Sequence, residues 1–189
     1  MHDNAEPQYV DDKEDTMSLF DVLKKRHSIR KYTEEAVSEE NLNKIVQAGL
    51  LSASSRGLRP WEMTVVTNKD ILSRMPGCRT GGANMLSGAD ACIVVTADPQ
   101  ACDVWIEDCS IVMSNMHLMA ESLGVGSCWI QGRLRQAADG RSTEEYLAEL
   151  VGIPEGHRLE AMLSIGMPAE KKAETLLEDL RYDKVKYIK

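Results

Sequence analysis

A short basic segment near the start of the chain, RHSIRKY at residues 26–32, is the first group of residues that could carry chemistry. Alternate side chains of an extended segment point to the same side, so Arg26, Ser28 and Arg30 are predicted to share one face, with the residues between them on the other. Two guanidinium groups beside a hydroxyl can hold a phosphate through paired hydrogen bonds. From these residues alone, an anion site and a solvated basic turn are about equally good interpretations.

A second polar segment, SASSRGLRPW at residues 52–61, combines three hydroxyls, two arginines and a glycine ahead of Pro60 and Trp61. Hydroxyls and free backbone N–H groups at the end of a helix can contact phosphate or sugar oxygens. Taken alone, this segment is more typical of an ordinary loop between a helix and a strand.

The sequence lacks the common hydrolytic and nucleotide-binding motifs, including GxxxxGK[ST], GxGxxG, HExxH and GxSxG. The four histidines are scattered, and His117, within a long apolar stretch, is interpreted as a core or interface residue. The five cysteines form no CxxC pair, and Cys92, Cys109 and Cys128 are expected to be buried, reduced thiols. These patterns argue against metal-dependent hydrolysis and serine-type acyl transfer.

The composition predicts a folded protein of one domain. The chain has 189 residues and a formal net charge of −8, which disfavours a nucleic-acid partner. No apolar run approaches the ~18 residues that a membrane span needs. Residues 1–16 hold six acidic residues and one lysine, a net −5, and are interpreted as a flexible acidic extension before a single domain at 17–189. The unpaired cysteines and the lack of an apolar signal segment predict a cytoplasmic location.

The elements that must position the two polar segments follow from hydrophobic periodicity and capping residues. We expect helices over 18–25, 38–50, 69–75, 81–87, 104–123 and 142–150, and strands over 61–67, 91–97, 127–131 and 158–165. This pattern predicts an α+β fold. The helix at 104–123 has apolar residues nearly all round, so we expect it to be buried at the centre of a subunit interface.

Four ordered motifs carry a family resemblance. RHSIRKY and then SSRGLRPW are followed by EDCSIVMSNMHLMAESLGVGSCWI at 107–130 and LSIGMP at 163–168. Together, over about residues 17–189, they resemble the nitroreductase family of FMN-dependent oxidoreductases. The resemblance implies a central sheet flanked by helices and an intertwined homodimer. It also implies FMN in two interface sites, and a tail at 184–189 that wraps onto the partner subunit.

The resemblance assigns FMN contacts residue by residue. It places Arg26 and Ser28 at the phosphate and ribityl chain, and Arg30 beside the N1–O2 edge of the flavin. The loop at 54–57 would reach the FMN of the other subunit, and Asn84 would lie beside the pyrimidine ring. The full set is Arg26, His27, Ser28, Arg30, Ser54, Ser55, Arg56, Gly57, Asn84, Trp129, Ile130, Gln131, Gly132 and Lys171 or Lys172.

In this set, the stretch from Trp129 to Gly132 would cover the flavin ring near N5, and one of the two lysines would close on the phosphate. The implied reaction is hydride transfer from NAD(P)H to flavin N5. An electron-poor acceptor, such as a nitroaromatic or a quinone, would then be reduced in a ping-pong cycle with no nucleophilic side chain. Two alternatives remain open at this stage: a flavoenzyme of the same fold with a different acceptor, dehalogenase-like for example, and a non-enzymatic FMN-binding dimer that senses redox state.

Overall fold

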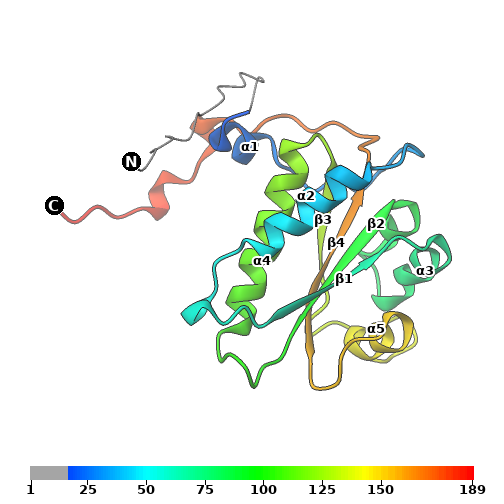
Figure 1. Ribbon diagram of the computed structural model, residues 1–189. Helices are drawn as coiled ribbons and strands as arrows, with labels where there is room; N and C mark the ends of the chain where they lie inside the picture. The colour runs from blue at the N-terminus through cyan, green and yellow to red at the C-terminus, as the bar shows by residue number, and fades with distance from the viewer. Residues whose placement is uncertain (1–16) are drawn as a thin grey trace, which may run out of the picture.

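The centre of the molecule is an antiparallel sheet of four strands. The computed structural model describes residues 17–189, so the acidic extension expected at 1–16 lies outside the described residues. The strands are β1 (Trp61–Val66), β2 (Ala91–Ala97), β3 (Gly126–Gln131) and β4 (Arg158–Gly166), in the order β1-β2-β4-β3. Each neighbouring pair is antiparallel. β1 and β3 are therefore the edge strands of the sheet (Figure 1).

Five α-helices accompany the sheet in the described part of the chain. They are α1 (Leu19–Lys25), α2 (Glu39–Leu50), α3 (Lys69–Arg74), α4 (Trp105–Ser122) and α5 (Thr143–Val151). The predicted α+β class is confirmed, and so are these five helices. The helix expected at 81–87 is wrong, because Gly81 and Gly82 adopt left-handed φ values of 73° and 78° and only a 3₁₀ turn, Asn84–Gly88, follows them.

Local capping explains where three of the helices begin. Ser18, Ser38 and Ser142 each precede a helix and accept a hydrogen bond from a backbone N–H in its first turn. At Ser142 the side chain of Glu145 also returns a bond to the cap residue, which completes a capping box. These short-range interactions were visible in the sequence, since each depends on residues three positions apart.

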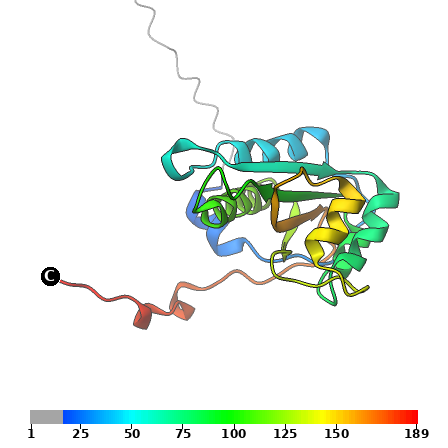
Figure 2. The ribbon, with the colours of Figure 1, turned by 90° about the horizontal axis from the view of Figure 1, so that it is seen from below.

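The two faces of the sheet carry separate apolar clusters. On one face, Ile93 and Val95 pack with α2 and α4 through Ile45 and Met113. On the other face, Cys92 and Val94 pack with α3, α5 and the turn at 84–88. Helices α3 and α5 lie together, apart from α2 and α4 (Figure 2). Because β2 is covered on both sides, every one of its residues is buried, as its apolar sequence predicted.

The chain returns to the start of the domain after β4. Residues 167–175 run beside residues 24–33, joined by backbone hydrogen bonds that include Thr33 N–H to Met167 O (2.8 Å) and Thr175 N–H to Lys24 O (3.0 Å). The remaining tail, 176–189, extends away from the body of the domain and is exposed throughout (Figure 1). No described helix is long and apolar enough to cross a membrane.

Candidate functional site

The basic segment at 26–30 is fixed against the start of β3. The backbone N–H of Ile29 donates to the carbonyl of Ser127 at 2.9 Å. A Cβ at Gly126 would lie 2.9 Å from the Ile29 side chain, so glycine is required for this close approach. The segment therefore lies along the outer edge of β3, next to the stretch from Trp129 to Gly132 that the resemblance assigns to the flavin.

Arg26 is held by a pair of hydrogen-bonding side chains on α4 and β3. Its Nη1 lies 2.9 Å from Nε2 of His117, and Nδ1 of His117 lies 2.6 Å from the Ser127 hydroxyl. His117 is buried, and Arg26 is partly buried. Burial, aided by the positive charge of Arg26, lowers the pKa of His117 to about 4, so the imidazole is neutral at pH 7.

The positive charge of Arg26 has no carboxylate partner within residues 17–189. The chain carries 30 acidic residues, so carboxylates are abundant. A partly buried cation without a counter-charge is costly, and such groups are normally paired. The arrangement is suited to an anion supplied from outside the chain.

Ser28 and Arg30 lie farther along the same segment, near the Cys128 thiol of β3. Burial raises the pKa of that thiol, and Arg30 and the Ser28 hydroxyl oppose the rise. The Arg30 side chain is exposed, and its Nη1 donates to the Ser28 carbonyl at 3.4 Å. Its backbone N–H donates to Glu170 at 2.7 Å, which ties this part of the segment to the returning chain.

Beyond this segment, no other strand among residues 17–189 pairs with the outer edge of β3, where the Trp129 carbonyl accepts only from the Cys128 thiol, at 3.6 Å. Ser127 directs its carbonyl outward to Ile29, and alternation along an antiparallel strand directs the backbone N–H and C=O of Trp129 and Gln131 to the same edge. Ile130 directs its side chain into the core, where it is 1% exposed. A Cβ at Gly132 would lie 2.5 Å from Leu159, so this glycine lets β3 pack closely on its neighbour.

The side chains of this stretch form a network on the α4 side of the sheet. Trp129 Nε1 donates to Gln131 Oε1 at 2.9 Å, and Gln131 Nε2 donates to the backbone carbonyl of Glu160 at 3.1 Å and to its carboxylate at 3.2 Å. Glu160 is buried, and burial raises its pKa. The network fixes the orientation of Trp129 and Gln131 along the free edge.

The loop at 54–57 lies at the opposite end of α4 from Arg26. The Ser55 N–H donates to the buried carboxylate of Asp108 at 2.8 Å, and the Ser54 hydroxyl accepts from the Arg59 N–H at 2.9 Å. Arg56 pairs with Asp103 at 2.6 Å. Arg56 and Gly57 both have left-handed φ values, 54° and 68°.

The distance along α4 separates this loop from the basic segment. His117 follows Asp108 by nine residues, roughly 14 Å along the helix axis. The fold of a single chain therefore does not bring the loop and Arg26 together. Asn84, in contrast, begins the 3₁₀ turn at 84–88. Ala83, just before the turn, and Leu86, within it, pack in the same cluster as Cys128 and Ile130. Asn84 therefore lies on the α3 and α5 face of the sheet, where it is exposed.

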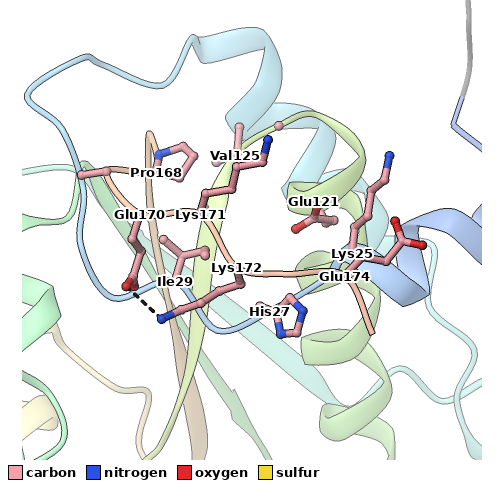
Figure 3. Close-up of a pocket in the computed structure, with 13 residues that line it drawn as sticks. Lys25, His27, Ile29, Glu121, Val125, Pro168, Glu170, Lys171, Lys172 and Glu174 are labelled. Carbon is pink, nitrogen blue, oxygen red and sulfur yellow. Dashed lines mark ion pairs between the residues drawn. The ribbon is translucent and has the colours of Figure 1, made fainter. Parts of the chain in front are cut away.

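A cavity of about 720 Å³ lies on the other side of the basic segment (Figure 3). It is lined by the turn after α4, by the returning chain with Lys171 and Lys172, and by His27 and Ile29. Arg26, Ser28 and Arg30 do not line it, as the alternation of an extended segment predicts. The lysines therefore share a cavity with His27 rather than with Arg26. Lys172 pairs with Glu170 at 3.1 Å, whereas the Lys171 side chain points away from that pair.

The remaining chemistry-bearing groups form no second centre in the described chain. All five cysteines are buried and free, as expected for Cys92, Cys109 and Cys128. Burial raises the pKa of Cys78 to about 12 and that of Cys109 to about 12, so these thiols are protonated at pH 7. No group of three or more His, Cys, Asp or Glu residues that could hold a metal ion occurs between residues 17 and 189.

Three residues of the site were not identified from the sequence. They are His117 and Ser127, which hold Arg26, and Asp108, which holds the loop. The sequence places His117 in the core or at an interface; it is buried, and both of its ring nitrogens are also hydrogen-bonded. The sequence does carry one signal for these residues, a single histidine and a single aspartate within an apolar helix. Buried polar groups need hydrogen-bond partners, so such residues indicate polar contacts inside the fold.

Comparison with known proteins agrees with this architecture. The family model "Nitroreductase family" matches residues 23–77 and 73–167. A structure of an FMN-dependent nitroreductase from Clostridium difficile R20291 is 44% identical, with a TM-score of 0.86, and the match covers 89% of this chain and 98% of that one. A protein from Archaeoglobus fulgidus whose name proposes an NADH dehydrogenase/NAD(P)H nitroreductase is 36% identical over 151 residues, 78% of this chain and 83% of its own.

A nitroreductase from Desulfitobacterium hafniense, solved with bound FMN, is 23% identical with a TM-score of 0.71 and shares the fold. The match covers 90% of this chain and 98% of that one. The predicted resemblance and the predicted central sheet flanked by helices are confirmed. The chain belongs to the nitroreductase family.

Proposed function

We propose that the chain is an FMN-dependent oxidoreductase that takes electrons from NAD(P)H and passes them to an electron-poor acceptor such as a nitroaromatic or a quinone. The observation that carries the proposal is the cation of Arg26, which is partly buried, has no carboxylate partner among residues 17–189, and is fixed beside the free edge of β3. FMN has a phosphate for that cation and a planar ring system for the strand edge. The names of the relatives from Clostridium difficile and Archaeoglobus fulgidus, with 44% and 36% identity, support the cofactor and the co-substrate respectively.

The donors of this chain suit the separate parts of FMN. Arg26 and Ser28 would hold the phosphate and the ribityl chain through charge-assisted and hydroxyl hydrogen bonds. The outward backbone N–H groups of Trp129 and Gln131 would donate to acceptor atoms of the ring. Because these N–H groups belong to a strand of the central sheet, they need little reorganisation when the ligand binds.

When bound, FMN supplies the redox chemistry, a two-electron exchange between NAD(P)H and the acceptor. The residues of this chain bind it and set its electrostatic surroundings. Arg30 would stabilise negative charge at the N1–O2 edge because its guanidinium is a permanent cation. The Trp129–Gln131–Glu160 network would keep the strand edge in register with the ring.

We also propose a homodimer with two FMN sites. The loop at 54–57 lies at the far end of α4 from Arg26, so its proposed contact with FMN requires a second copy of the chain. Ile111 on α4 and Leu50 and Leu51 at the end of α2 are exposed apolar side chains that a partner would cover.

Anaerobic spectroscopy tests the proposed activity. The FMN-loaded protein should lose its flavin absorbance when NADH or NADPH is added, and a nitroaromatic or a quinone should restore it. Absorbance that NAD(P)H cannot reduce, with FMN still bound, would favour the redox-sensing dimer instead. A reduced flavin reoxidised only by a halogenated acceptor would favour the dehalogenase-like alternative.

A further inference from the structure

A hydrogen-bonded chain of three side chains joins parts of the molecule that are distant in the sequence. Arg26 follows α1, His117 lies in α4, and Ser127 lies in β3. The two contacts measure 2.9 Å, from Arg26 Nη1 to His117 Nε2, and 2.6 Å, from His117 Nδ1 to Ser127 Oγ. His117 is 6% exposed and Ser127 is 2% exposed. Interactions this far inside the protein persist only if every polar atom has a partner.

The direction of these hydrogen bonds follows from the chemistry of arginine. A guanidinium group has only N–H donors, so Nε2 of His117 must accept from Arg26. The ring proton therefore lies on Nδ1, which donates to the Ser127 hydroxyl. Burial and the neighbouring guanidinium both oppose a second proton on the ring, and the pKa of His117 falls to about 4.

A neutral acceptor at this place has a specific consequence for Arg26. A carboxylate would also orient the guanidinium, but it would cancel much of its charge toward a ligand. The neutral imidazole fixes one N–H of Arg26 and leaves its positive charge uncompensated by any residue between 17 and 189. The guanidinium has five N–H donors, and His117 uses one of them.

We infer that His117 is a positioning residue for a phosphate-binding arginine: as a neutral imidazole with its proton directed to Ser127, it holds the Arg26 guanidinium in the orientation that binds the phosphate group of FMN. This inference rests on the proposed function. It assigns no contact between His117 and the flavin, and its effect is transmitted through Arg26 alone.

A comparison of two flavins isolates that effect. Flavin-free protein is titrated with FMN and with riboflavin, which lacks the phosphate, and the measured quantity is the ratio of the dissociation constant for riboflavin to that for FMN. Arg26→Ala should lower this ratio by about 30-fold, the loss expected for charge-assisted hydrogen bonds. His117→Leu should lower it about tenfold, because Arg26 keeps its charge but loses its fixed orientation.

Three further variants separate positioning from plain destabilisation. His117→Gln offers an amide oxygen to Arg26 and an amide N–H to Ser127, so its ratio should stay within about threefold of the parent value. Ser127→Ala removes the acceptor that fixes the tautomer, and the ratio should fall about threefold. Met113→Ala makes a cavity in the same helix, since Met113 is fully buried, and should leave the ratio unchanged.

Each outcome decides the inference. The positioning role of His117 is supported if the ratio falls in His117→Leu and recovers in His117→Gln. If His117→Leu does not fold, a lower ratio in Ser127→Ala supports the same role. Equal losses of FMN and riboflavin affinity in the His117 and Ser127 variants would overturn the positioning role. If the ratio still falls in Arg26→Ala in that case, the proposed function stays intact. A parent chain that binds neither flavin, or that binds both equally, would overturn the phosphate assignment to Arg26 and this inference with it.

Discussion

The buried imidazole of His117 links the stability of the fold to pH. Its pKa is about 4 in the folded chain, against a reference value of about 6.5. The unfolded chain therefore binds the proton more tightly, so the stability from this group is complete above about pH 6.5 and is lost as the pH falls toward 4. Between pH 7 and pH 5 the free energy of unfolding should fall by about 2 kcal/mol from this residue.

Urea unfolding of the parent and of His117→Gln at the two pH values measures this contribution. The glutamine variant has no titrating group at this position, so its loss of stability between pH 7 and pH 5 should be smaller by about that amount. Groups such as Glu160, whose pKa is raised by burial, act equally in both proteins and cancel in the comparison. The same pH dependence in both proteins would contradict a buried neutral His117.

Arg30 carries a second prediction at the level of a single residue. A cation near the N1–O2 edge of the flavin favours the reduced, more negative cofactor, so Arg30→Gln should lower the midpoint potential of bound FMN by about 20–40 mV. The side chain is exposed and bonds only to the Ser28 carbonyl among the described residues, so the melting temperature should not change. Lys31→Gln removes a neighbouring exposed charge and serves as the control.

Spectroelectrochemistry beside a melting curve measures both effects. A potential that stays the same in Arg30→Gln with FMN bound would refute the electrostatic role. A lower melting temperature without a change in potential would indicate a structural role for Arg30 instead.

At the level of elements, the first turn of α4 anchors the loop at 54–57. The buried carboxylate of Asp108 accepts from the Ser55 N–H, and the Cys102 thiol lies 3.4 Å from its other oxygen. Asp108→Ala leaves both donors unpaired and should lower the free energy of unfolding by about 2 kcal/mol. Asp108→Asn retains an acceptor oxygen, so its free energy of unfolding should fall by less than that of Asp108→Ala.

Limited trypsin digestion reports on the loop itself, since Arg56 is exposed there and is followed by Gly57, whereas Pro60 protects the bond after Arg59. The alanine variant should be cut after Arg56 faster than the parent, and the asparagine variant at an intermediate rate. Cleavage at one rate in all three proteins would show that Asp108 does not hold the loop.

The elements also show which part of the fold the sequence could predict. Helix starts at Ser18, Ser38 and Ser142 depend on contacts between residues three apart; the first two are predicted where they occur, and at the third the sequence leaves Ser142 and Thr143 as alternative caps. The strand order β1-β2-β4-β3 depends on pairings between distant segments, and apolar patterns alone do not encode it. The helix expected at 81–87 failed because two left-handed glycines decide the local backbone.

The site divides in the same way. The alternation of the segment after Arg26 follows from local geometry, and it correctly separates His27 and Ile29, which line the cavity, from the residues between them. The bond from Arg26 to His117 spans 91 residues and could not be predicted without the packing of α4 on β3. The assignments to FMN itself remain predictions.

At the scale of the whole molecule, the exposed apolar residues predict a dimer. Leu19, Phe20 and Leu23 on α1 are 67%, 57% and 51% exposed, and the tail carries Leu176, Leu177, Leu180, Val185 and Ile188 at 42–88% exposure. Exposed apolar side chains concentrated on α1 and on the tail at 176–189 are typical of a surface that a second copy of the chain covers. Sedimentation should therefore give a dimer at micromolar concentration.

Removal of residues 176–189 tests how much the tail contributes to the stability of that dimer. The shortened chain keeps every strand and α-helix of the described fold, so its secondary structure should persist. Its dimer should be weaker and should dissociate at a higher protein concentration than the dimer of the parent chain. A full-length chain that sediments as a stable folded monomer at micromolar concentration would reject the dimer.

Native mass spectrometry of the purified protein supplied with FMN tests the proposed FMN-binding dimer in one experiment, because it measures assembly and cofactor stoichiometry together. We expect the mass of two chains of 21.0 kDa plus two FMN molecules. The double variant Arg26→Ala with Ser28→Ala should give the dimer without FMN, since the phosphate loses its cation and hydroxyl. A parent protein that takes up no FMN would contradict the proposed cofactor, and a double variant that keeps FMN at full occupancy would contradict its binding through Arg26 and Ser28.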